Sequence, residues 1–492
     1  MRLKSKNLRW IAGRPVVILT EKAAKKLNVH VDDRVKVSLN KKSIYAVVDL
    51  FEGVVRDAEI GLSKEISSYL RTKGNETLEI STAEMFLGAK IIKKKLDGAS
   101  LTKEEIVKVV SEITNNNLTE TEIAYFVSAE KNQGMTLQET IYLTEAMINS
   151  GKHIHFKDKI VADKHCIGGI AGNRTTPIVV SICTAAGLKM PKSSSRAITS
   201  ASGTADVMET IANVELSTDK IKKIVDKTNG CLVWGGSLGL APSDDKIIQV
   251  ERILNLDVEP QLLASIISKK ISAGSNRIVV DIPYGGGKMK TKGEAKALGD
   301  KFAKIGKHFN VKFKPVYTDG TQPIGNGFGP VLEMQDVLSV LRNEPDCPQD
   351  LKKKSLYLAA EIMSLCGIYF AGSKAKKILE SGEAYKKFKE IVNAQNESKD
   401  FDKRVKSLSL AKVHFHYYSP KSGKVVEINN QKINSLCRIL GTPENPRAGV
   451  YLHRHLGKVK EGDDLLTLYS ESEERLKDAE KFLLEYQPIK IV

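Results

Sequence analysis

The stretch from Asp163 to Glu209 restricts the fold and function of the chain more than any other. It contains the runs DKHCIGGIAGN, SSSRAITS and GTAD, in which glycines, hydroxyl-bearing residues and cations gather between apolar segments. Glycines let the backbone approach a ligand closely, and amide, hydroxyl and ammonium groups together favour an anion. The stretch therefore predicts phosphate-binding loops in an α/β domain. The alternative is a pair of ordinary glycine-rich turns in such a domain.

The spacing of these glycines differs from the common nucleotide motifs. It does not match the G-x-x-x-x-G-K-[ST] pattern of P-loops, and no G-x-G-x-x-G opens a helix after a strand here. Neither a nucleoside triphosphate nor a dinucleotide is therefore the predicted ligand.

The charge of the chain agrees with an anionic ligand but does not specify nucleic acid. The 492 residues include 76 Lys and Arg against 59 Asp and Glu, a net charge of +17, which attracts phosphorylated molecules. Lysine runs such as 93–95 and 352–354 are typical of solvated faces. The aromatic residues are scattered instead of interleaved with basic ones, so we expect no nucleic acid partner. A nucleic-acid-binding protein is the alternative from another functional class.

The cysteines and the apolar runs bear on the cellular compartment. The six cysteines form no C-x-x-C pair, which favours reduced thiols. The N-terminal sequence MRLKSKNLRW has no signal-peptide core, and no apolar run is long enough to cross a bilayer. We expect a cytoplasmic protein without a membrane partner.

Hydrophobic periodicity divides the chain into four predicted parts of an α/β multidomain protein. Alternating strands come first, followed by three capping boxes that begin at Thr102, Thr119 and Thr136. A βα alternation with strands near 160–162, 231–234, 278–282 and 311–317 then favours a largely parallel sheet. The predicted domains are a β-rich domain at 1–84, a helical domain at 85–157 completed by about 243–273, a large α/β domain at 158–410 interrupted by that helical insertion, and a C-terminal α/β unit at 411–492.

Further polar segments follow predicted strands outside the first stretch. Lys288 ends a glycine run after the strand IVVDIP, and the loop QPIGNGFGP follows the next strand. Because loops after parallel strands gather at one edge of the sheet, these segments are expected to meet. Ser265 and Lys269 are four residues apart and share one helical face, just after Asp257. Together these groups suit a molecule with two phosphate groups.

Some of these residues have plain structural alternatives. Asp257 also suits a helix N-cap, and Lys269 and Lys288 also suit a solvated surface. The glycine-rich sequence that follows His165 predicts a turn there, and this position suits an acid/base role as well as it suits a buried structural histidine. The pairs His153/His155, His414/His416 and His453/His455 have strand spacing but no Cys or carboxylate companion nearby in the sequence, so no metal site is predicted.

The runs DKHCIGG, SSSRAITSASGTAD, LDVEPQLLASIISKK, DIPYGGGK and QPIGNGFGPVLE resemble the thymidine phosphorylase superfamily over nearly the whole chain, in particular its AMP phosphorylase branch. The resemblance implies a helical domain hinged to an α/β domain, preceded by an extra N-terminal domain. The implied reaction is reversible phosphorolysis of nucleoside 5'-monophosphates such as AMP, with CMP and UMP as further substrates, to free base and ribose 1,5-bisphosphate. Inorganic phosphate is then a co-substrate, with no cofactor or metal, and a homodimer or larger homo-oligomer is expected.

The same resemblance assigns roles to individual residues. Asp257 matches the proton donor to the leaving base. His165, chosen from its place in the sequence and not from the resemblance, is the second catalytic candidate. The phosphate-binding residues are Lys164, Cys166, Ser194 and Thr204. The nucleotide-binding residues are Gly169, Ser195, Arg196, Ala197, Ile198, Thr199, Ser200, Thr204, Ser265, Lys269 and Lys288.

The chain departs from the superfamily pattern at two points. Cys166 replaces a serine, which exchanges a good hydrogen-bond donor for a weak one. The loop DIPYGGGK is one residue short, so Lys290 is the alternative to Lys288. The competing enzymes are a pyrimidine nucleoside phosphorylase and a phosphoribosyltransferase, although no acidic pair for magnesium stands out in the sequence.

Overall fold

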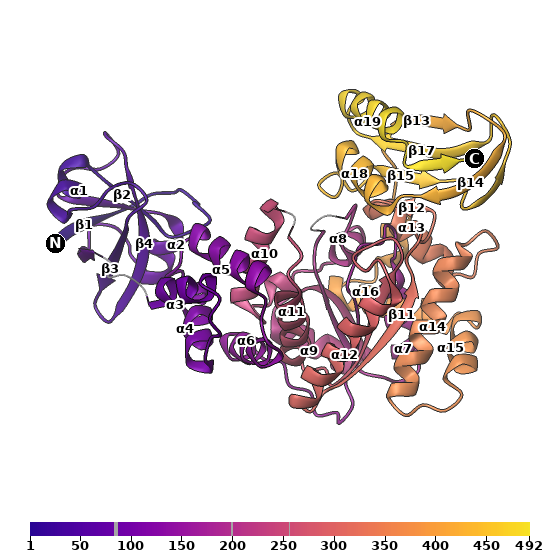
Figure 1. The fold of residues 1–492 in the computed structure, drawn as a ribbon, viewed down its shortest axis with the longest axis horizontal. Helices are drawn as coiled ribbons and strands as arrows, with labels where there is room; N and C mark the ends of the chain where they lie inside the picture. Colours follow the sequence, from indigo (N-terminus) through magenta and orange to yellow (C-terminus); the bar gives the residue numbers. More distant parts are fainter. Residues whose placement is uncertain (83–86, 198–199, 255) are drawn as a thin grey trace. The chain divides into compact units, whose positions relative to one another are not determined.

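The computed structural model describes residues 1–82, 87–197, 200–254 and 256–492, which form two compact units. The first unit contains residues 1–146, 243–254 and 258–261, and the second contains most of the remaining chain. Figure 1 follows the chain from indigo at the N-terminus to yellow at the C-terminus.

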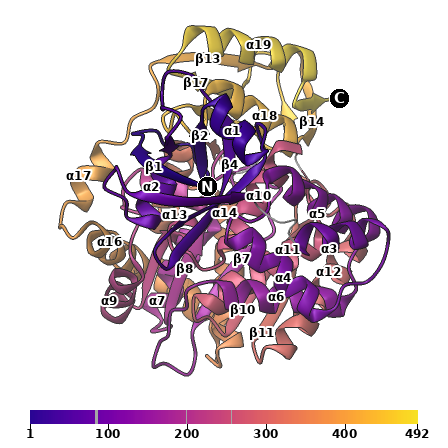
Figure 2. The same ribbon diagram turned by 90° about the vertical axis from the view of Figure 1, so that its left-hand side faces the viewer.

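A closed six-stranded barrel opens the first unit (Figures 1 and 2). Its order is β1-β5-β2-β4-β3-β6, and alternate side chains such as Val35 and Val37 fill the interior. Its elements are β1 (Arg2–Asn7), β2 (Val16–Leu19), α1 (Glu21–Leu27), β3 (Arg34–Leu39), β4 (Lys42–Leu50), β5 (Glu59–Leu62), α2 (Lys64–Leu70) and β6 (Thr77–Thr82).

A group of helices follows the barrel in the first unit. The helices are α3 (Leu87–Leu96), α4 (Lys103–Thr114), α5 (Glu120–Gln133), α6 (Leu137–Ser150) and α10 (Pro242–Leu254). The capping boxes at Thr102 and Thr119 are confirmed, and Thr136 exchanges the same pair of hydrogen bonds with Glu139. The prediction of solvated lysine runs is wrong for Lys95, which is buried and pairs with Glu139 at 2.8 Å. The partner comes from another helix, so the local sequence gave no sign of it.

Glu130 in α5 is a buried carboxyl group whose two oxygens have no hydrogen-bond partner among the described residues. Burial raises its pKa well above the usual range, and the charge of Glu251 raises it further. Above the ordinary pKa of about 4.5 the unfolded chain releases this proton while the folded chain keeps it, so stability falls as the pH rises.

We therefore expect Glu130→Met to stabilise the first unit by about 1–3 kcal/mol at pH 8 and by less at pH 5. Calorimetric melting at both pH values measures this difference. An equal effect at the two pH values would contradict the assignment.

A parallel sheet lies at the centre of the second unit. Its strands are β7 (Ala162–Cys166), β8 (Met190–Ser194), β9 (Gly230–Trp234), β10 (Arg277–Tyr284) and β11 (Lys312–Asp319). Three of the strands pair in the order β11-β10-β7, and β8 pairs with β9. One parallel bridge between Val161 and Lys189 joins the two groups. Apart from that bridge, β7 and β8 form no hydrogen-bonded ladder within the described residues.

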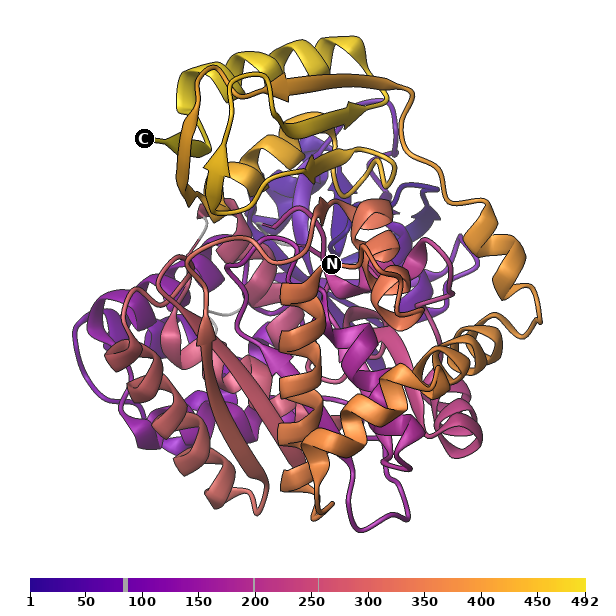
Figure 3. The same ribbon diagram turned by 90° about the vertical axis from the view of Figure 1, so that its right-hand side faces the viewer.

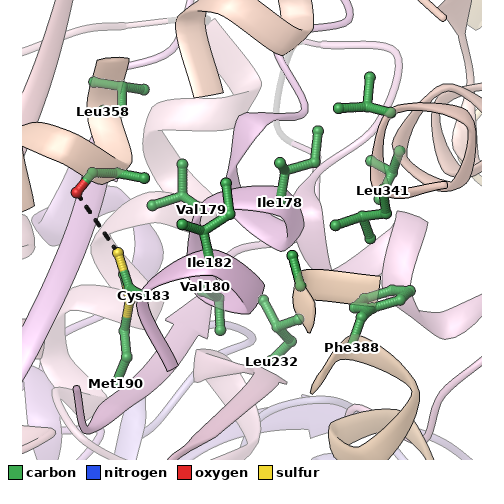
Figure 4. Close-up of a cluster of buried hydrophobic side chains, with 14 of the residues drawn as sticks. Ile178, Val179, Val180, Ile182, Cys183, Met190, Leu232, Leu341, Leu358 and Phe388 are labelled. Carbon is green, nitrogen blue, oxygen red and sulfur yellow. Dashed lines mark hydrogen bonds between the residues drawn. The ribbon is translucent and has the colours of Figure 1, made fainter. Parts of the chain in front are cut away.

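Helices surround this sheet, and α7 is buried along almost its whole length. Ile178 and Val179 of α7 pack with Leu232, Leu341 and Phe388 in the main core (Figure 4). The helices are α7 (Thr175–Ala185), α8 (Thr204–Glu209), α9 (Thr218–Thr228), η1 (Gly235–Ser237), α11 (Glu259–Ser272), α12 (Lys292–His308), α13 (Pro330–Leu341), α14 (Gln349–Leu365), α15 (Ala371–Glu380), α16 (Glu383–Asn396) and α17 (Phe401–Lys406). None of the helices described is long and apolar enough to cross a membrane.

The last segment adds two antiparallel sheets and two helices to the second unit. Figure 3 shows its long helix α19 lying over the strands, in yellow. The sheets have the orders β12-β15-β17-β13 and β16-β14-β18. The elements are β12 (Gly327–Phe328), β13 (Val413–Tyr418), β14 (Gly423–Ile428), α18 (Asn430–Leu440), β15 (Gly449–Leu452), β16 (Gly457–Val459), β17 (Asp464–Ser470), α19 (Glu473–Tyr486) and β18 (Ile489–Ile491). The boundaries of the four predicted domains stay predictions.

Candidate functional site

The loops that follow β7, β10 and β11 meet at the carboxyl edge of the sheet, as the sequence predicts. A Cβ atom on Gly169 would lie 2.8 Å from the backbone nitrogen of Lys288, and one on Gly172 would lie 2.2 Å from the carbonyl oxygen of Ile324. The φ angle is +90° at Gly169 and +73° at Gly172, a left-handed conformation that residues with a side chain rarely adopt. The Ile324 N–H donates to the Ala171 carbonyl at 3.1 Å. The glycines of DKHCIGGIAGN are therefore required for loop packing.

Lys164 and Cys166 point from β7 toward the same side of the sheet. The Nζ atom of Lys164 donates to the hydroxyl of Thr175 at 2.8 Å, at the start of α7, and the side chain is 1% exposed. Burial lowers the pKa of Lys164, while Cys166 and Asp281 act in the opposite direction. Asn173 donates to the Cys166 sulfur at 3.2 Å, and burial raises the pKa of that thiol. Lys164 thus lies beneath the loops and contacts Thr175, which no sequence motif marks as a partner.

Asp163 faces the opposite side of the sheet, where it binds two buried lysines. Lys270 of α11 lies 2.9 Å and Lys192 of β8 lies 3.6 Å from its carboxylate oxygens. Burial and the charge of Lys270 lower the pKa of Lys192 well below its usual range. His165 is only half-buried, but desolvation and the same lysines lower its pKa well below its usual range. Burial and the neighbouring lysines therefore favour the neutral imidazole of His165 and oppose its protonation.

The loop after β8 carries most of the predicted nucleotide-binding residues. The Ser194 hydroxyl is enclosed and has no hydrogen-bond partner among the described residues, whereas Ser195 is exposed. Asp206 accepts hydrogen bonds from the N–H groups of Ala197 and Gly203, both at 2.7 Å, and so fixes the loop. Ser200 donates to the carbonyl of Ser202. Ile198 and Thr199 lie outside the described residues.

Arg196 is engaged with protein groups. Its guanidinium pairs with Glu209, Glu215 and Asp206, and it stacks on the Trp234 ring at 4.7 Å. A nucleotide phosphate would have to compete with three carboxylates for this side chain.

Thr204 belongs to a buried hydrogen-bond network that no local sequence pattern indicates. Arg174 donates to the Thr204 hydroxyl at 2.7 Å, to the carboxylate of Glu333 at 2.6 Å and to the Ser202 carbonyl at 2.8 Å. Glu333 also accepts a hydrogen bond from the Ser202 hydroxyl. Arg174 thereby connects the loop after β7 with α8 and α13.

Asp257 and Lys288 form an ion pair with each other. The Lys288 side chain is 23% exposed and that of Asp257 is 58% exposed. Lys290 is exposed, and its backbone N–H donates to Glu294. Of the two alternative lysines, Lys288 is the one that contacts the glycine-rich loops. Ser265 and Lys269 lie one turn apart on α11, both half-buried.

Two buried asparagines on α18 hold the loops together. Asn430 accepts the Ala171 N–H at 3.0 Å and donates to the carbonyls of Gly320 at 3.1 Å and Gly286 at 3.4 Å. Asn434 accepts the Ala201 N–H at 3.0 Å. Four segments that follow different strands therefore depend on one face of a helix near the C-terminus.

We expect Asn430→Asp to leave the protein folded but to lower kcat/KM about 10- to 100-fold, because its second oxygen would face two carbonyls and displace the loops. Steady-state kinetics measure this effect. Asn393→Asp, on α16, is a control because its side chain caps Phe401 instead. Equal activity of the two variants would contradict the role of Asn430.

Two family models match the chain in its central part. The glycosyl transferase family helical bundle domain matches residues 89–151, and the glycosyl transferase family α/β domain matches residues 158–278. These matches agree with the helical group and the parallel sheet described above.

Relatives of known name extend the match to the full length. An AMP phosphorylase from Pyrococcus horikoshii is 43% identical over 100% of this chain and 98% of its own. The chain belongs to the AMP phosphorylase family. Another relative, from Hahella chejuensis, is named putative thymidine phosphorylase. It is 38% identical over 93% of this chain and 90% of its own.

A solved structure shares the fold of this family member. Anthranilate phosphoribosyltransferase from Thermus thermophilus superposes with a TM-score of 0.53 at 16% identity, covering 62% of this chain and 99% of that one. At this identity the likeness concerns the fold alone.

Proposed function

We propose that the chain catalyses reversible phosphorolysis of nucleoside 5'-monophosphates, AMP above all, to free base and ribose 1,5-bisphosphate. The observation that carries the proposal is the meeting of the glycine-rich loops at the carboxyl edge of the sheet, with the Asp257–Lys288 pair beside them. The full-length similarity to AMP phosphorylases supports the same reaction.

The attacking phosphate is assigned to the loops after β7 and β8. The Ser194 hydroxyl is enclosed without a partner and suits a phosphate oxygen. The amide oxygen of Asn173 is enclosed in the same way and suits a protonated phosphate oxygen or a ribose hydroxyl. Lys164 contributes its charge from beneath, at the first turn of α7, where the helix dipole also favours an anion. No cofactor enters this scheme.

The chemical step exchanges one bond for another at the sugar. A phosphate oxygen forms a bond to C1' as the bond from C1' to the base nitrogen breaks, and the electron pair leaves with the base. The base then needs a proton, which we assign to Asp257. Its carboxylate pairs with Lys288 in the free protein, so it has to take up this proton from solvent when the substrate separates the pair. A positioned acid of this kind contributes about 10²- to 10⁴-fold. Orienting the phosphate beside C1' removes a further entropic barrier.

The ion pair between Asp257 and Lys288 lies where we assign the nucleotide. Substrate binding has to exchange this pair for contacts of Lys288 with an anionic group and of Asp257 with the base. Because both side chains are partly exposed, the exchange costs little. Ser265 and Lys269 on α11 are assigned to the nucleotide on the family resemblance. A homo-oligomer remains part of the proposal.

Cys166→Ser should lower the KM for phosphate about 3- to 10-fold, since a hydroxyl is a stronger donor than a thiol. Initial rates at varied phosphate and saturating AMP measure this change. Cys347→Ser is the control, because Cys347 is a buried thiol of the main core. An unchanged KM in Cys166→Ser would remove this position from the phosphate site.

The deciding experiment measures base release from AMP, CMP, UMP and the corresponding nucleosides, with and without inorganic phosphate. We expect release from the monophosphates only when phosphate is present, with ribose 1,5-bisphosphate as the second product. Equal rates without phosphate would identify a hydrolase. Preference for thymidine or uridine would favour a pyrimidine nucleoside phosphorylase. Two relatives are named putative thymidine phosphorylase.

A further inference from the structure

Four polar side-chain atoms converge on one face of the C-terminal four-stranded sheet. Val413, Phe415 and Tyr417 of β13 pack against the hydrophobic core, so the alternate residues of this strand occupy the opposite face. There His416 of β13 meets His453, which directly follows β15.

Asp464, the first residue of β17, and Thr467 of the same strand complete the group. The distances from His416 Nδ1 are 2.9 Å to Asp464 Oδ2 and 3.2 Å to Thr467 Oγ1. His453 Nε2 lies 2.8 Å from Thr467 Oγ1 and 3.6 Å from Asp464 Oδ2. The two imidazoles and the carboxylate each offer a ligand atom, all within 4.8 Å of one another.

We propose that His416, His453 and Asp464 bind a divalent transition-metal ion of the zinc type. Two imidazole nitrogens and one carboxylate oxygen are a ligand set that zinc accepts, with a fourth position for water or the Thr467 hydroxyl. Bond lengths of about 2.0–2.2 Å in a tetrahedral site place neighbouring ligand atoms about 3.3–3.5 Å apart. His416 Nδ1 and His453 Nε2 lie 2.9 Å and 3.6 Å from Asp464 Oδ2, which brackets that spacing, and all three ligand atoms lie within 4.8 Å of one another. A metal ion therefore requires only modest side-chain movements.

The sequence alone predicts no metal site at this position. The sequence shows the paired histidines but no carboxylate beside them, because Asp464 is distant from His416 and joins it only through strand pairing. The second oxygen of Asp464, Oδ1, is enclosed and has no hydrogen-bond partner among the described residues. A hydrogen-bond network alone leaves that oxygen unsatisfied, whereas a metal ion can be bound by both oxygens of a carboxylate.

A metal ion at this position would connect the edge strand β13 with β17 and with the end of β15. Since it binds the folded sheet and not the unfolded chain, it would stabilise the C-terminal segment. This role does not depend on the nucleotide chemistry proposed above.

The test uses the full-length protein after removal of metal with a chelator and dialysis. Zinc titration by calorimetry should show one ion per chain, and cobalt should give the visible absorption of a low-symmetry, four-coordinate site. Zinc should raise the melting temperature by a few degrees. His416→Ala and His453→Ala should weaken binding by more than about 100-fold, since losing even an outer partner of a metal site costs about 10- to 100-fold.

His414→Ala is the matched control, because His414 lies on the same face of β13 but its Nδ1 atom contacts the carbonyl of Lys412. This variant should bind zinc as the unaltered protein does. Absence of stoichiometric binding, or binding that survives in the His416→Ala/His453→Ala double variant, would overturn the proposal. Equal loss in His414→Ala would show non-specific binding to the histidine-rich face and would also overturn it.

Discussion

Asp257→Asn should lower kcat for phosphorolysis of AMP about 10²- to 10⁴-fold while AMP still binds. The asparagine keeps the shape of the side chain but has no acidic proton to give to the leaving base. Asp257 is 58% exposed and pairs with a partly exposed lysine, so its replacement should change stability by less than about 1 kcal/mol. Loss of rate therefore reports chemistry and not unfolding.

The measurement combines steady-state rates with calorimetric titration of AMP. Asp300→Asn is a matched control, since Asp300 is an exposed carboxylate on α12. If the affinity for AMP fell as steeply as kcat in Asp257→Asn, the result would assign Asp257 to substrate binding instead of acid catalysis. A normal kcat in this variant would assign the proton to another group.

Arg174→Met should destabilise the second unit by about 3–5 kcal/mol, because it leaves Glu333 buried without its cationic partner. Burial already raises the pKa of Glu333, and Arg174 opposes that shift. Without the arginine, Glu333 has to take up a proton on folding whenever the unfolded chain has released it. The stability loss should therefore be larger at pH 8 than at pH 5.

Urea unfolding followed by Trp234 fluorescence in a Trp10→Phe background reports this unit. Glu333→Gln should recover part of the loss in the Arg174→Met protein, since no charge then remains to be buried. Arg342→Met removes a half-exposed pair with Glu344 and contacts with the hydroxyl and ring of Tyr385, and it should cost about 1 kcal/mol. If Arg174→Met and Arg342→Met lowered the free energy of unfolding equally, the buried network of Arg174 would not stabilise the second unit more than a surface pair does.

Features that depend on neighbouring residues were accessible from the sequence. The capping boxes of α4 and α5 need only residues three apart, and both are confirmed. The meeting of the loops after β7, β10 and β11 follows from parallel strands, which the βα alternation indicates.

Features that depend on distant partners were missed. The strand β8 has the sequence MPKSS, which is not typical of a buried strand. Lys192 is nevertheless buried, because its ammonium group donates a hydrogen bond to the Ser193 carbonyl and pairs with Asp163. The prediction of a solvated lysine run is also wrong for Lys354, whose side chain is only 8% exposed and pairs with Asp281 at 3.1 Å. Asn430 contacts Ala171 across 259 positions of the chain, and no local pattern marks it.

The closed barrel at the N-terminus limits how residues 1–82 can associate with anything else. In an open sheet the outermost strands offer unpaired amide and carbonyl groups to a further strand. In this barrel every strand pairs with two neighbours, so a partner cannot bind by adding a strand to an open edge. Any association through this part of the chain has to be encoded in outward-facing side chains, where single substitutions can abolish it without disturbing the backbone.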